Sequence, residues 1–380
     1  RLFRAAGIHF ILASQTLGGN LVLAQKRDAI FGQVPIRIAL KNTLSESMQT
    51  LAVNNPAAAF LRPREAIVNL DYGEVSQNKK CVVAFADESV LTPLRYQWWE
   101  KAKGEYRAPY VFEGEKRIMI SDSISNVIKK KCENSTPSAF FGERISIRGE
   151  AIGIPMLMEP GRNIAVIGAP DGECNQAVGM MESMAISLAV QHTKGDARFL
   201  FCNFTNTKII FSKQYPHFSK LMEQCGYYLE DIPCRQFEET LRNLMEEKTE
   251  NETVYMFGIG MDKWGYEPDP YGQGTVLKEF VEKGPSEGLH FFGWWVKASS
   301  YTAQVAGFGN SDAFNTKIFL RVDERAVQSL TSPFVRWKSQ NNRGLLSDSV
   351  ELEEELVFIP YAPVTSDDVL KIKAYLYEAN

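Results

Sequence analysis

The sequence has no apolar run long enough to cross a membrane, no signal-peptide pattern and no excess of positive charge. Its uninterrupted apolar runs, such as Phe291–Val296, are short, whereas a bilayer-spanning helix needs about 20 residues. Lys and Arg number 42 against 46 Asp and Glu, which gives a net charge of -4. We therefore expect a cytoplasmic segment without membrane contact and exclude a protein that coats nucleic acid with a broad basic face. A local positive patch in a ring pore stays compatible with an acidic body.

Cysteine pairs of the C-x-x-C type and histidine-rich stretches are also lacking, although the chain has 6 cysteines and 4 histidines. Without such spacing, neither a metal site nor a redox pair is indicated. We interpret the cysteines as reduced, buried thiols. They are Cys81, Cys132, Cys174, Cys202, Cys225 and Cys234.

The length of 380 residues is too great for one ordinary domain, since about 150 residues per domain is typical. We expect two or three domains. The 44% hydrophobic and 23% charged residues are typical of globular proteins and exclude a disordered, collagenous or coiled-coil chain. Because the chain opens at Arg1, without Met and directly before a strand-like run, we expect it to be a fragment.

Short apolar segments in the first hundred residues predict strands. The run Gly7–Ala13 is continuously apolar, which is typical of a strand buried on both faces of a parallel sheet. His9 in this run is expected to be a core histidine. We interpret Trp98 and Trp99 as packing anchors on a helix. The other predicted elements here are strands at 36–40, 65–70 and 80–85 and helices after residue 40 and at 94–103.

The pattern weakens after residue 104, where glycine and proline mark connectors. We predict a first domain over 1–104, a linker over 105–138 and a second domain over 139–380. A short helix is expected at 124–132, and two short strands at 144–158. Beyond these, strands alternate with helices, which indicates a doubly wound α/β domain. The strands are predicted at 163–168, 197–204, 253–257, 289–295, 317–322 and 356–361, and the helices at 176–192, 237–247 and 276–283.

The methionine stripe of the helix at 176–192 follows helical spacing. Its apolar positions include Met181, Met184 and Leu188. Such a stripe is more often part of a core than of a cofactor site. We therefore predict that this helix packs against the sheet.

The chain repeats itself at an interval of about 280 residues. Gly7-Ile8-His9-Phe10 recurs as Gly288-Leu289-His290-Phe291, and Arg37–Lys41 and Met48–Leu51 have similar counterparts in the same order at residues 317–321 and 327–330. Ordered matches of this kind indicate two copies of one domain. We infer that the first copy lacks its opening half, whose counterpart in the second copy lies before Gly288.

The stretch from Arg1 to Gln15 resembles the segment that follows the acidic, magnesium-binding strand of FtsK/SpoIIIE-type motor ATPases, where the pattern is Arg-Ala-x-Gly-Ile-His-Leu-x-Leu-Ala-Thr-Gln. The resemblance is strong over about residues 1–90 and in register over about 140–365. It implies a RecA-like P-loop NTPase sheet flanked by helices, in one partial and one complete degenerate copy. Arg4 matches the arginine that reaches into the neighbouring subunit's nucleotide, and Gln15 the glutamine that senses the γ-phosphate.

The second copy contains a degenerate P-loop. Residues 164–175 form an apolar strand, a turn with Gly168 and Gly172, and a helix start, which is the setting of G-x-x-x-x-G-K-[ST]. The second glycine of that motif is replaced by Glu173, the lysine by Cys174 and the hydroxyl residue by Asn175. The first change places a carboxylate at a phosphate oxygen, and the others remove the cation and the magnesium ligand.

The second copy has also lost the acidic strand end. The strand at 253–257 should end in Asp-Glu, but Gly258 and Ile259 follow, and Asp262 is too distant to replace them. Trp295 and Val296 stand where the first copy has Ser14 and Gln15. We predict that this copy keeps the fold without hydrolysing ATP.

The resemblance implies the C-terminal part of a ring-forming motor, a homo-oligomer that is most simply a hexamer. ATP and Mg²⁺ are expected in the upstream motor domain and not in the degenerate copy. DNA, the commonest cargo of the superfamily, is the first choice. The alternative is a protein-export ATPase like that of type VII secretion, with secreted proteins as substrates and the last domain a binding or regulatory module. A purely structural pseudo-ATPase scaffold is the third option, and membrane association of the full-length protein stays open.

Overall fold

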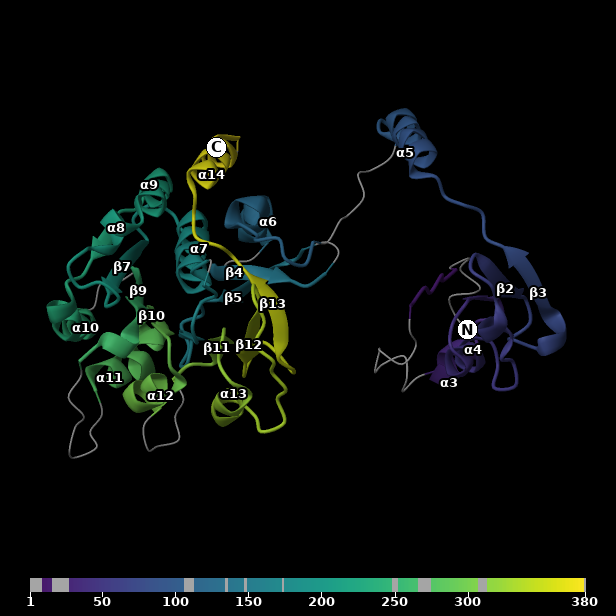
Figure 1. Cartoon of the computed structure of the whole chain (residues 1–380). Helices are drawn as coiled ribbons and strands as arrows, with labels where there is room; N and C mark the ends of the chain where they lie inside the picture. Colours follow the sequence, from purple (N-terminus) through teal and green to yellow (C-terminus); the bar gives the residue numbers. More distant parts are fainter. Residues whose placement is uncertain are drawn as a thin grey trace. The chain divides into compact units, whose positions relative to one another are not determined.

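A computed structural model of the chain describes residues 9–15, 27–105, 113–133, 136–146, 149–172, 174–247, 252–265, 275–306 and 313–378. The chain falls into two compact units, Arg1–Ala108 and Pro109–Asn380, here called unit 1 and unit 2 (Figure 1). Each unit has its own hydrophobic core.

Unit 2 is built on one mixed sheet, which has ten strands in the described part of the chain. Six neighbouring strands run parallel in the order β11-β6-β10-β9-β7-β8. Beyond β11 the order β12-β13-β4-β5 continues antiparallel. The strands are β4 (Ser138–Arg144), β5 (Ala151–Pro155), β6 (Ile164–Ile167), β7 (Ala197–Asn203), β8 (Leu229–Asp231), β9 (Thr253–Ile259), β10 (Leu289–Trp295), β11 (Thr316–Phe319), β12 (Gly344–Asp348) and β13 (Leu356–Pro360).

Helices cover both faces of this sheet, so its central strands are buried on both sides. One core cluster joins α6, α7, α9 and α14 to the sheet, and the other joins α10, α11 and α13 (Figure 1). Every residue of β6 and β10 is buried. The helices are α6 (Ile120–Glu133), α7 (Gln176–Gln191), α8 (Phe211–Gln214), α9 (Pro216–Gln224), α10 (Phe237–Glu246), α11 (Val276–Lys283), α12 (Ala298–Tyr301), α13 (Glu324–Leu330) and α14 (Ser366–Glu378).

The central helix of unit 2 is α7, and all of its residues are buried. Met181, Met184 and Leu188 lie in the core cluster, which confirms that the methionine stripe is a packing surface. His290 is fully buried in β10, as expected of a core histidine.

Two predictions near the start of unit 2 need correction. The helix α6, inside the interval 105–138, packs into the core through Ile120, Ile124 and Val127, so this part of the interval is more than a connector. The strand before Gly149 is β4, which begins at Ser138 rather than near Arg144. Its paired phenylalanines, Phe140 and Phe141, are fully buried, and this apolar pair was missed because the preceding Ser-Thr-Pro-Ser cluster resembled a loop.

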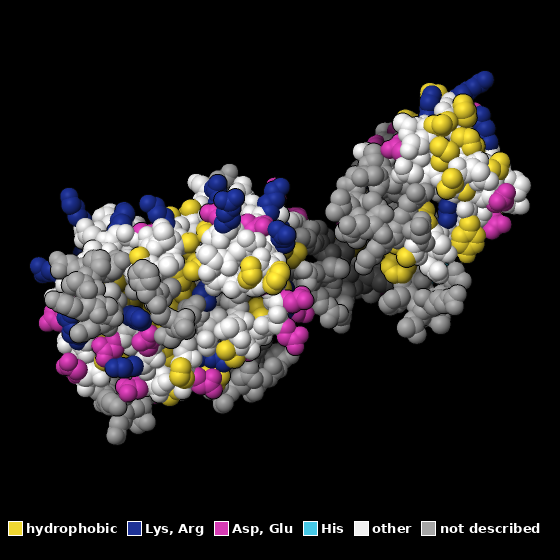
Figure 2. All heavy atoms as spheres, turned by 90° about the horizontal axis from the view of Figure 1, so that it is seen from below, with side chains coloured by type: hydrophobic (Ala, Val, Ile, Leu, Met, Phe, Trp, Pro, Cys, Tyr) yellow, Lys and Arg dark blue, Asp and Glu magenta, His cyan; other side chains and the backbone are white. Residues whose placement is uncertain are grey.

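Unit 1 contains a small antiparallel sheet in the order β1-β2-β3. Its core is formed by five buried residues, Ala39, Leu51, Ala58, Leu61 and Ile67. The elements are α3 (Arg27–Phe31), β1 (Arg37–Leu40), α4 (Leu44–Thr50), β2 (Glu65–Asn69), β3 (Asn78–Val82) and α5 (Glu88–Ala102). Many large apolar side chains of unit 1 are exposed, among them Phe10, Ile11, Ile36, Ile38 and Leu40 (Figure 2).

The first predicted strand is not formed in the part of it that the structure describes. Residues 9–15 have no regular secondary structure and are exposed, His9 included, so His9 is no core histidine here. The matching strand β10 is held between β6 and β9. The described residues of unit 1 provide no strand in either of those two places, and an apolar strand without neighbours leaves its backbone groups unpaired.

The helix α5 differs from its prediction in packing. Trp98 and Trp99 are 59% and 46% exposed, and no residue of the helix is buried, so the interpretation of these side chains as packing anchors is wrong for this chain. Cys81 in β3 is likewise exposed rather than buried.

Unit 1 repeats the order of elements at the end of unit 2. A strand, a seven-residue helix and two antiparallel strands follow one another as β1-α4-β2-β3 and as β11-α13-β12-β13. Both helices have a side-chain N-cap, Thr43 in α4 and Asp323 in α13. In unit 2 the second edge of β11 is paired with β6, whereas the described part of unit 1 offers β1 no such neighbour. The division at residues 104 and 138 stays a prediction.

Candidate functional site: the turn between β6 and α7

The turn that the sequence predicts to be a degenerate P-loop follows the carboxyl end of β6 and leads into α7. Gly168 turns the chain with a φ of +119°, and its N–H donates to the Trp295 carbonyl at 2.8 Å. A Cβ at this position would lie 3.1 Å from the backbone nitrogen of Arg321. Both the positive φ and the close approach therefore require glycine here.

The carboxylate of Asp171 lies inside the turn and is bonded to the start of α7. Its Oδ1 accepts the Cys174 N–H at 2.8 Å, and its Oδ2 accepts from the side-chain amide of Gln176. The Asp171 N–H in turn donates to Gln176 Oε1 at 3.0 Å. The backbone donor at the position of the motif's lysine is thus already paired with an anion of the same chain.

The remaining motif positions do not fit Mg·ATP. Asn175 is the N-cap of α7, and its Oδ1 accepts the Val178 N–H at 3.2 Å, so that oxygen is engaged in helix capping. Burial raises the pKa of the Cys174 thiol despite the nearby positive charge of Arg117, so Cys174 supplies neither a cation nor a thiolate at neutral pH. Gly172 borders open space, and Glu173 lies outside the described residues.

The end of β9 has no acidic pair for magnesium. Gly258 is packed so closely that a Cβ would lie 2.5 Å from the sulfur of Met261. The carboxylate of Asp262 is at the same edge of the sheet, but its two oxygens accept the backbone N–H groups of Val296 and Lys297. This carboxylate therefore joins the end of β9 to the end of β10.

Trp294 and Trp295 end β10 and belong to the core clusters on opposite faces of the sheet. Trp294 Nε1 donates to the Gly168 carbonyl at 3.1 Å. Trp295 Nε1 donates to Gln304 Oε1 at 2.7 Å, and Gln304 donates onward to the Met261 carbonyl. Both indole rings are buried, so their hydrogen bonds join the end of β10 to the turn after β6 and to Gln304.

The roles predicted for Arg4 and Gln15 stay predictions. Arg4 lies outside the described residues. Gln15 is exposed and belongs to no strand, so its predicted place at a strand end is not observed. At the repeat interval the counterpart of Arg4 is Pro285.

Asp171 and Trp294 are the residues that sequence reasoning missed. The spacing Asp171-x-x-Cys174 is that of a side chain that bonds to a backbone N–H three residues later, a signal present in the sequence. The contact of Trp294 with Gly168 had no such signal, because it depends on the pairing of β10 with β6.

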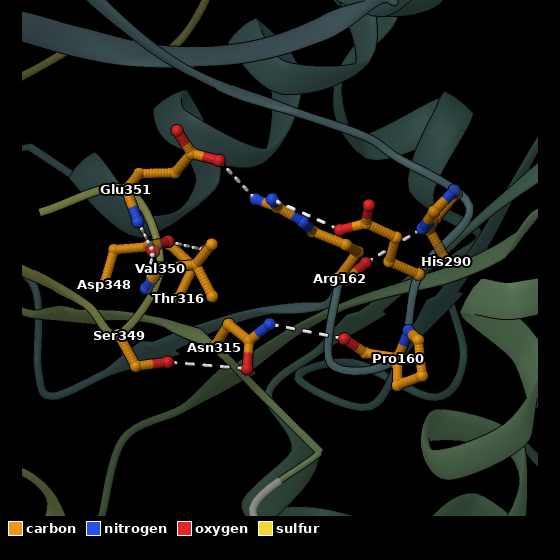
Figure 3. A network of polar contacts seen from close by, with 10 residues as sticks. Pro160, Arg162, His290, Asn315, Thr316, Asp348, Ser349, Val350 and Glu351 are labelled. Atoms are coloured by element: carbon orange, nitrogen blue, oxygen red, sulfur yellow. Dashed lines mark hydrogen bonds and ion pairs between the residues drawn. The ribbon is translucent and has the colours of Figure 1, made fainter.

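A second polar cluster lies at the opposite, amino end of β6 (Figure 3). The side chain of Arg162 is 2% exposed and pairs with Glu351 at 2.8 Å. The Arg162 carbonyl accepts from Nδ1–H of His290 at 2.8 Å, and Asn315 donates to the Pro160 carbonyl at 3.3 Å. The cluster joins the turn before β6 to the turn after β12, which is a structural role.

Burial lowers the pKa of His290 to about 4, and its Nε2 has no hydrogen-bond partner among the described residues. The unfolded histidine takes up a proton near pH 6.5, whereas the folded one stays neutral down to about pH 4. Stability is therefore full above pH 6.5 and falls as the pH drops towards 4, by about 3 kcal/mol. We expect the stability of the parent relative to His290→Phe to decrease as the pH drops from 7 to 4.5, measured as the difference between the urea midpoints of the two proteins. A difference that does not change with pH would contradict the neutral, buried state of His290.

Comparison with known proteins gives structural matches only. No protein-family model and no curated protein matches the sequence. The cytoplasmic domain of the Thermomonospora curvata type VII secretion ATPase EccC aligns with 98% of this chain and 47% of its own, at 14% identity and a TM-score of 0.56. EssC (ATPases 2 and 3) from Geobacillus thermodenitrificans aligns with 72% and 52% at 15% identity and a TM-score of 0.43. The pCW3 conjugation coupling protein TcpA aligns with 82% and 90% at 10% identity and a TM-score of 0.42.

The EccC similarity defines the class of fold. The chain has the fold of FtsK/SpoIIIE-type P-loop motor ATPases, and its large sheet is the RecA-like sheet flanked by helices that the sequence predicts. The chain spans about half the length of the EccC structure that it matches. Within the described residues, no helix combines the length and the apolarity of a membrane span.

Proposed function

We propose that this chain is part of an FtsK/SpoIIIE-like motor and that unit 2 is its non-hydrolytic copy. The observation that carries the proposal is the pairing of the Cys174 N–H with Asp171, since that donor faces a phosphate oxygen in a working P-loop. Two further observations support the proposal. The strand β9 ends in Gly258 and Ile259, without an acidic residue, and the carboxylate of Asp262 is hydrogen-bonded to the backbone of Val296 and Lys297. Unit 2 then serves the motor by packing or by contact with a partner.

Unit 1 is proposed to be the carboxyl-terminal half of a motor domain. The support is the repeated order of elements and the exposed apolar face of β1, where Ile38 and Leu40 are 62% and 57% exposed. The equivalent face in unit 2 is buried under α7 and its neighbours. In this proposal ATP and Mg²⁺ bind in the motor domain to which Arg4 and Gln15 belong, within an oligomeric ring.

For the cargo, the similarity to EccC over almost the whole chain favours protein export over DNA translocation. DNA remains the competing candidate, because it is the commonest cargo of the superfamily that the sequence resembles. The two candidate functions predict different effects of salt on DNA binding. A DNA translocase should bind duplex DNA with an affinity that weakens steeply as the salt concentration rises, because it binds through phosphate contacts. A duplex-DNA affinity with that dependence, measured by fluorescence anisotropy on this chain, would favour DNA translocation.

The purified chain is expected to show no ATP turnover. The reason is the absence of the cation at Cys174 and of an acidic pair at Gly258, which together position the phosphates and the metal. A coupled phosphate-release assay with Mg·ATP measures this, with an intact P-loop ATPase as the positive control. A steady-state rate that disappears on substitution of Asp262 or Asn175 would refute the proposal.

A further inference from the structure

Three hydrogen bonds of the degenerate loop involve Asp171. Both oxygens of Asp171 accept hydrogen bonds, one from the Cys174 N–H at 2.8 Å and one from Gln176. Gln176 is the first residue of α7 and is 3% exposed. Its side-chain amide donates to the carboxylate of Asp171 and accepts the N–H of the same residue. The buried side chain of Gln176 therefore holds the Asp171 carboxylate in its place.

The position of this carboxylate follows the chemistry of the motif. The loop binds phosphate in active members because its backbone N–H groups converge on an anion at a helix N-terminus. The helix α7 is 16 residues long, so the positive end of its dipole favours a negative group at that place. One backbone N–H at this place, that of Cys174, donates to the Asp171 carboxylate, although Cys174 and Asn175 no longer supply the groups that hold Mg·ATP.

We propose that Asp171 is an internal substitute for a phosphate group, an autoinhibitory contact that holds the loop folded and excludes nucleotide from unit 2. The inference rests on the proposed non-hydrolytic role and adds the residue that enforces it. A second anion at the Cys174 N–H would have to displace a carboxylate that is bonded through both of its oxygens, and like charges repel at short distance.

The test compares two variants of the full chain. The first variant restores the P-loop motif by three substitutions, Glu173→Gly, Cys174→Lys and Asn175→Thr, and keeps Asp171. The second variant carries the same three substitutions and also Asp171→Ala. Binding of Mg·ADP is measured by isothermal titration. We expect the variant without Asp171 to bind at least about tenfold more tightly, a difference of about 1.4 kcal/mol. Equal affinities, or no binding by either variant, would overturn the inference.

A second measurement applies if the restored loops do not fold. The single variant Asp171→Ala should gain thermal stability from inorganic phosphate relative to chloride at matched ionic strength, while the parent chain should not. The same response in both proteins, or none in the variant, would overturn the inference. ATP turnover by the parent chain would instead refute the proposed function, so the two failures are distinguishable.

Discussion

Glu182→Gln should make unit 2 more stable at neutral pH. Glu182 lies on α7, is 1% exposed and accepts the Val364 N–H at 2.7 Å. Burial raises the pKa of its carboxyl to about 8, and the nearby Asp368 adds to the effect. Glutamine keeps an oxygen for the Val364 N–H and removes the cost of holding an ionisable group in the core.

The sign of the pH dependence follows from this raised pKa. The unfolded carboxyl loses its proton near pH 4.5, whereas the folded one keeps it to about pH 8. Stability is therefore full below pH 4.5 and falls as the pH rises towards 8, by about 3 kcal/mol at pH 7. Glu182→Gln should remove that fall, so the gain over the parent chain should be large at pH 8 and small at pH 4.5.

Chemical denaturation of the whole chain, followed by near-ultraviolet circular dichroism, measures the effect. Of the 6 tryptophans, four are buried and lie in unit 2, namely Trp264, Trp294, Trp295 and Trp337, so the signal reports on the right unit. The exposed Glu239 on α10 provides the control, since Glu239→Gln should leave the slope unchanged. A variant of Glu182 that is less stable than the parent at pH 8 would contradict the protonated, buried state of this carboxyl.

Glu182 and His290 act in opposite directions on the stability of unit 2. The histidine contribution is lost as the pH falls from 6.5 towards 4, and the glutamate contribution is lost as the pH rises from 4.5 towards 8. Their sum has its maximum in the overlap, between about pH 4.5 and 6.5. Within the overlap the two slopes cancel, so each variant should expose the slope of the other group: His290→Phe should lose stability as the pH rises from 4.5 to 6.5, and Glu182→Gln should lose it as the pH falls over the same range.

The strands and the loop of unit 2 could be predicted because their signals are local. The apolar run at Ile164–Ile167, the turn at Gly168 and the helix start at Asn175 follow one another in the sequence, and the structure keeps that order. The hydrogen bond of Trp294 to Gly168 could not be predicted from local signals, because the two residues are far apart in the sequence. The predicted strand at Gly7–Ala13 failed in its described part for the same reason, because a strand also needs neighbours that its own sequence does not contain.

Gly179→Ala should strongly destabilise unit 2, although alanine is the better helix former by about 1 kcal/mol. Gly179 lies in α7, one turn before Glu182, and faces the segment that follows β13. A Cβ there would lie 2.4 Å from the Ala362 carbonyl carbon and 2.4 Å from the Tyr361 oxygen. These are backbone atoms, which cannot move aside as a flexible side chain would.

The segment after β13, which Gly179 faces, is fixed by hydrogen bonds to two other parts of unit 2. The Ala362 N–H donates to the Ile118 carbonyl at 2.9 Å, and the Val364 N–H donates to Glu182. An added methyl group must therefore push α7 away from this segment and weaken the bond to Glu182. Overpacking of this kind costs about 3 kcal/mol or more when the backbone has to shift.

Gly172→Ala is the matched control, because it is the same substitution in the loop before the same helix. A Cβ at Gly172 would meet nothing within 4 Å, so we expect a change of about 1 kcal/mol or less, in either direction. Denaturant midpoints of both variants and the parent chain make the comparison. If Gly179→Ala were as stable as Gly172→Ala, the close approach of α7 to the segment after β13 would be wrong. The burial of Glu182, which depends on that approach, would then be wrong with it.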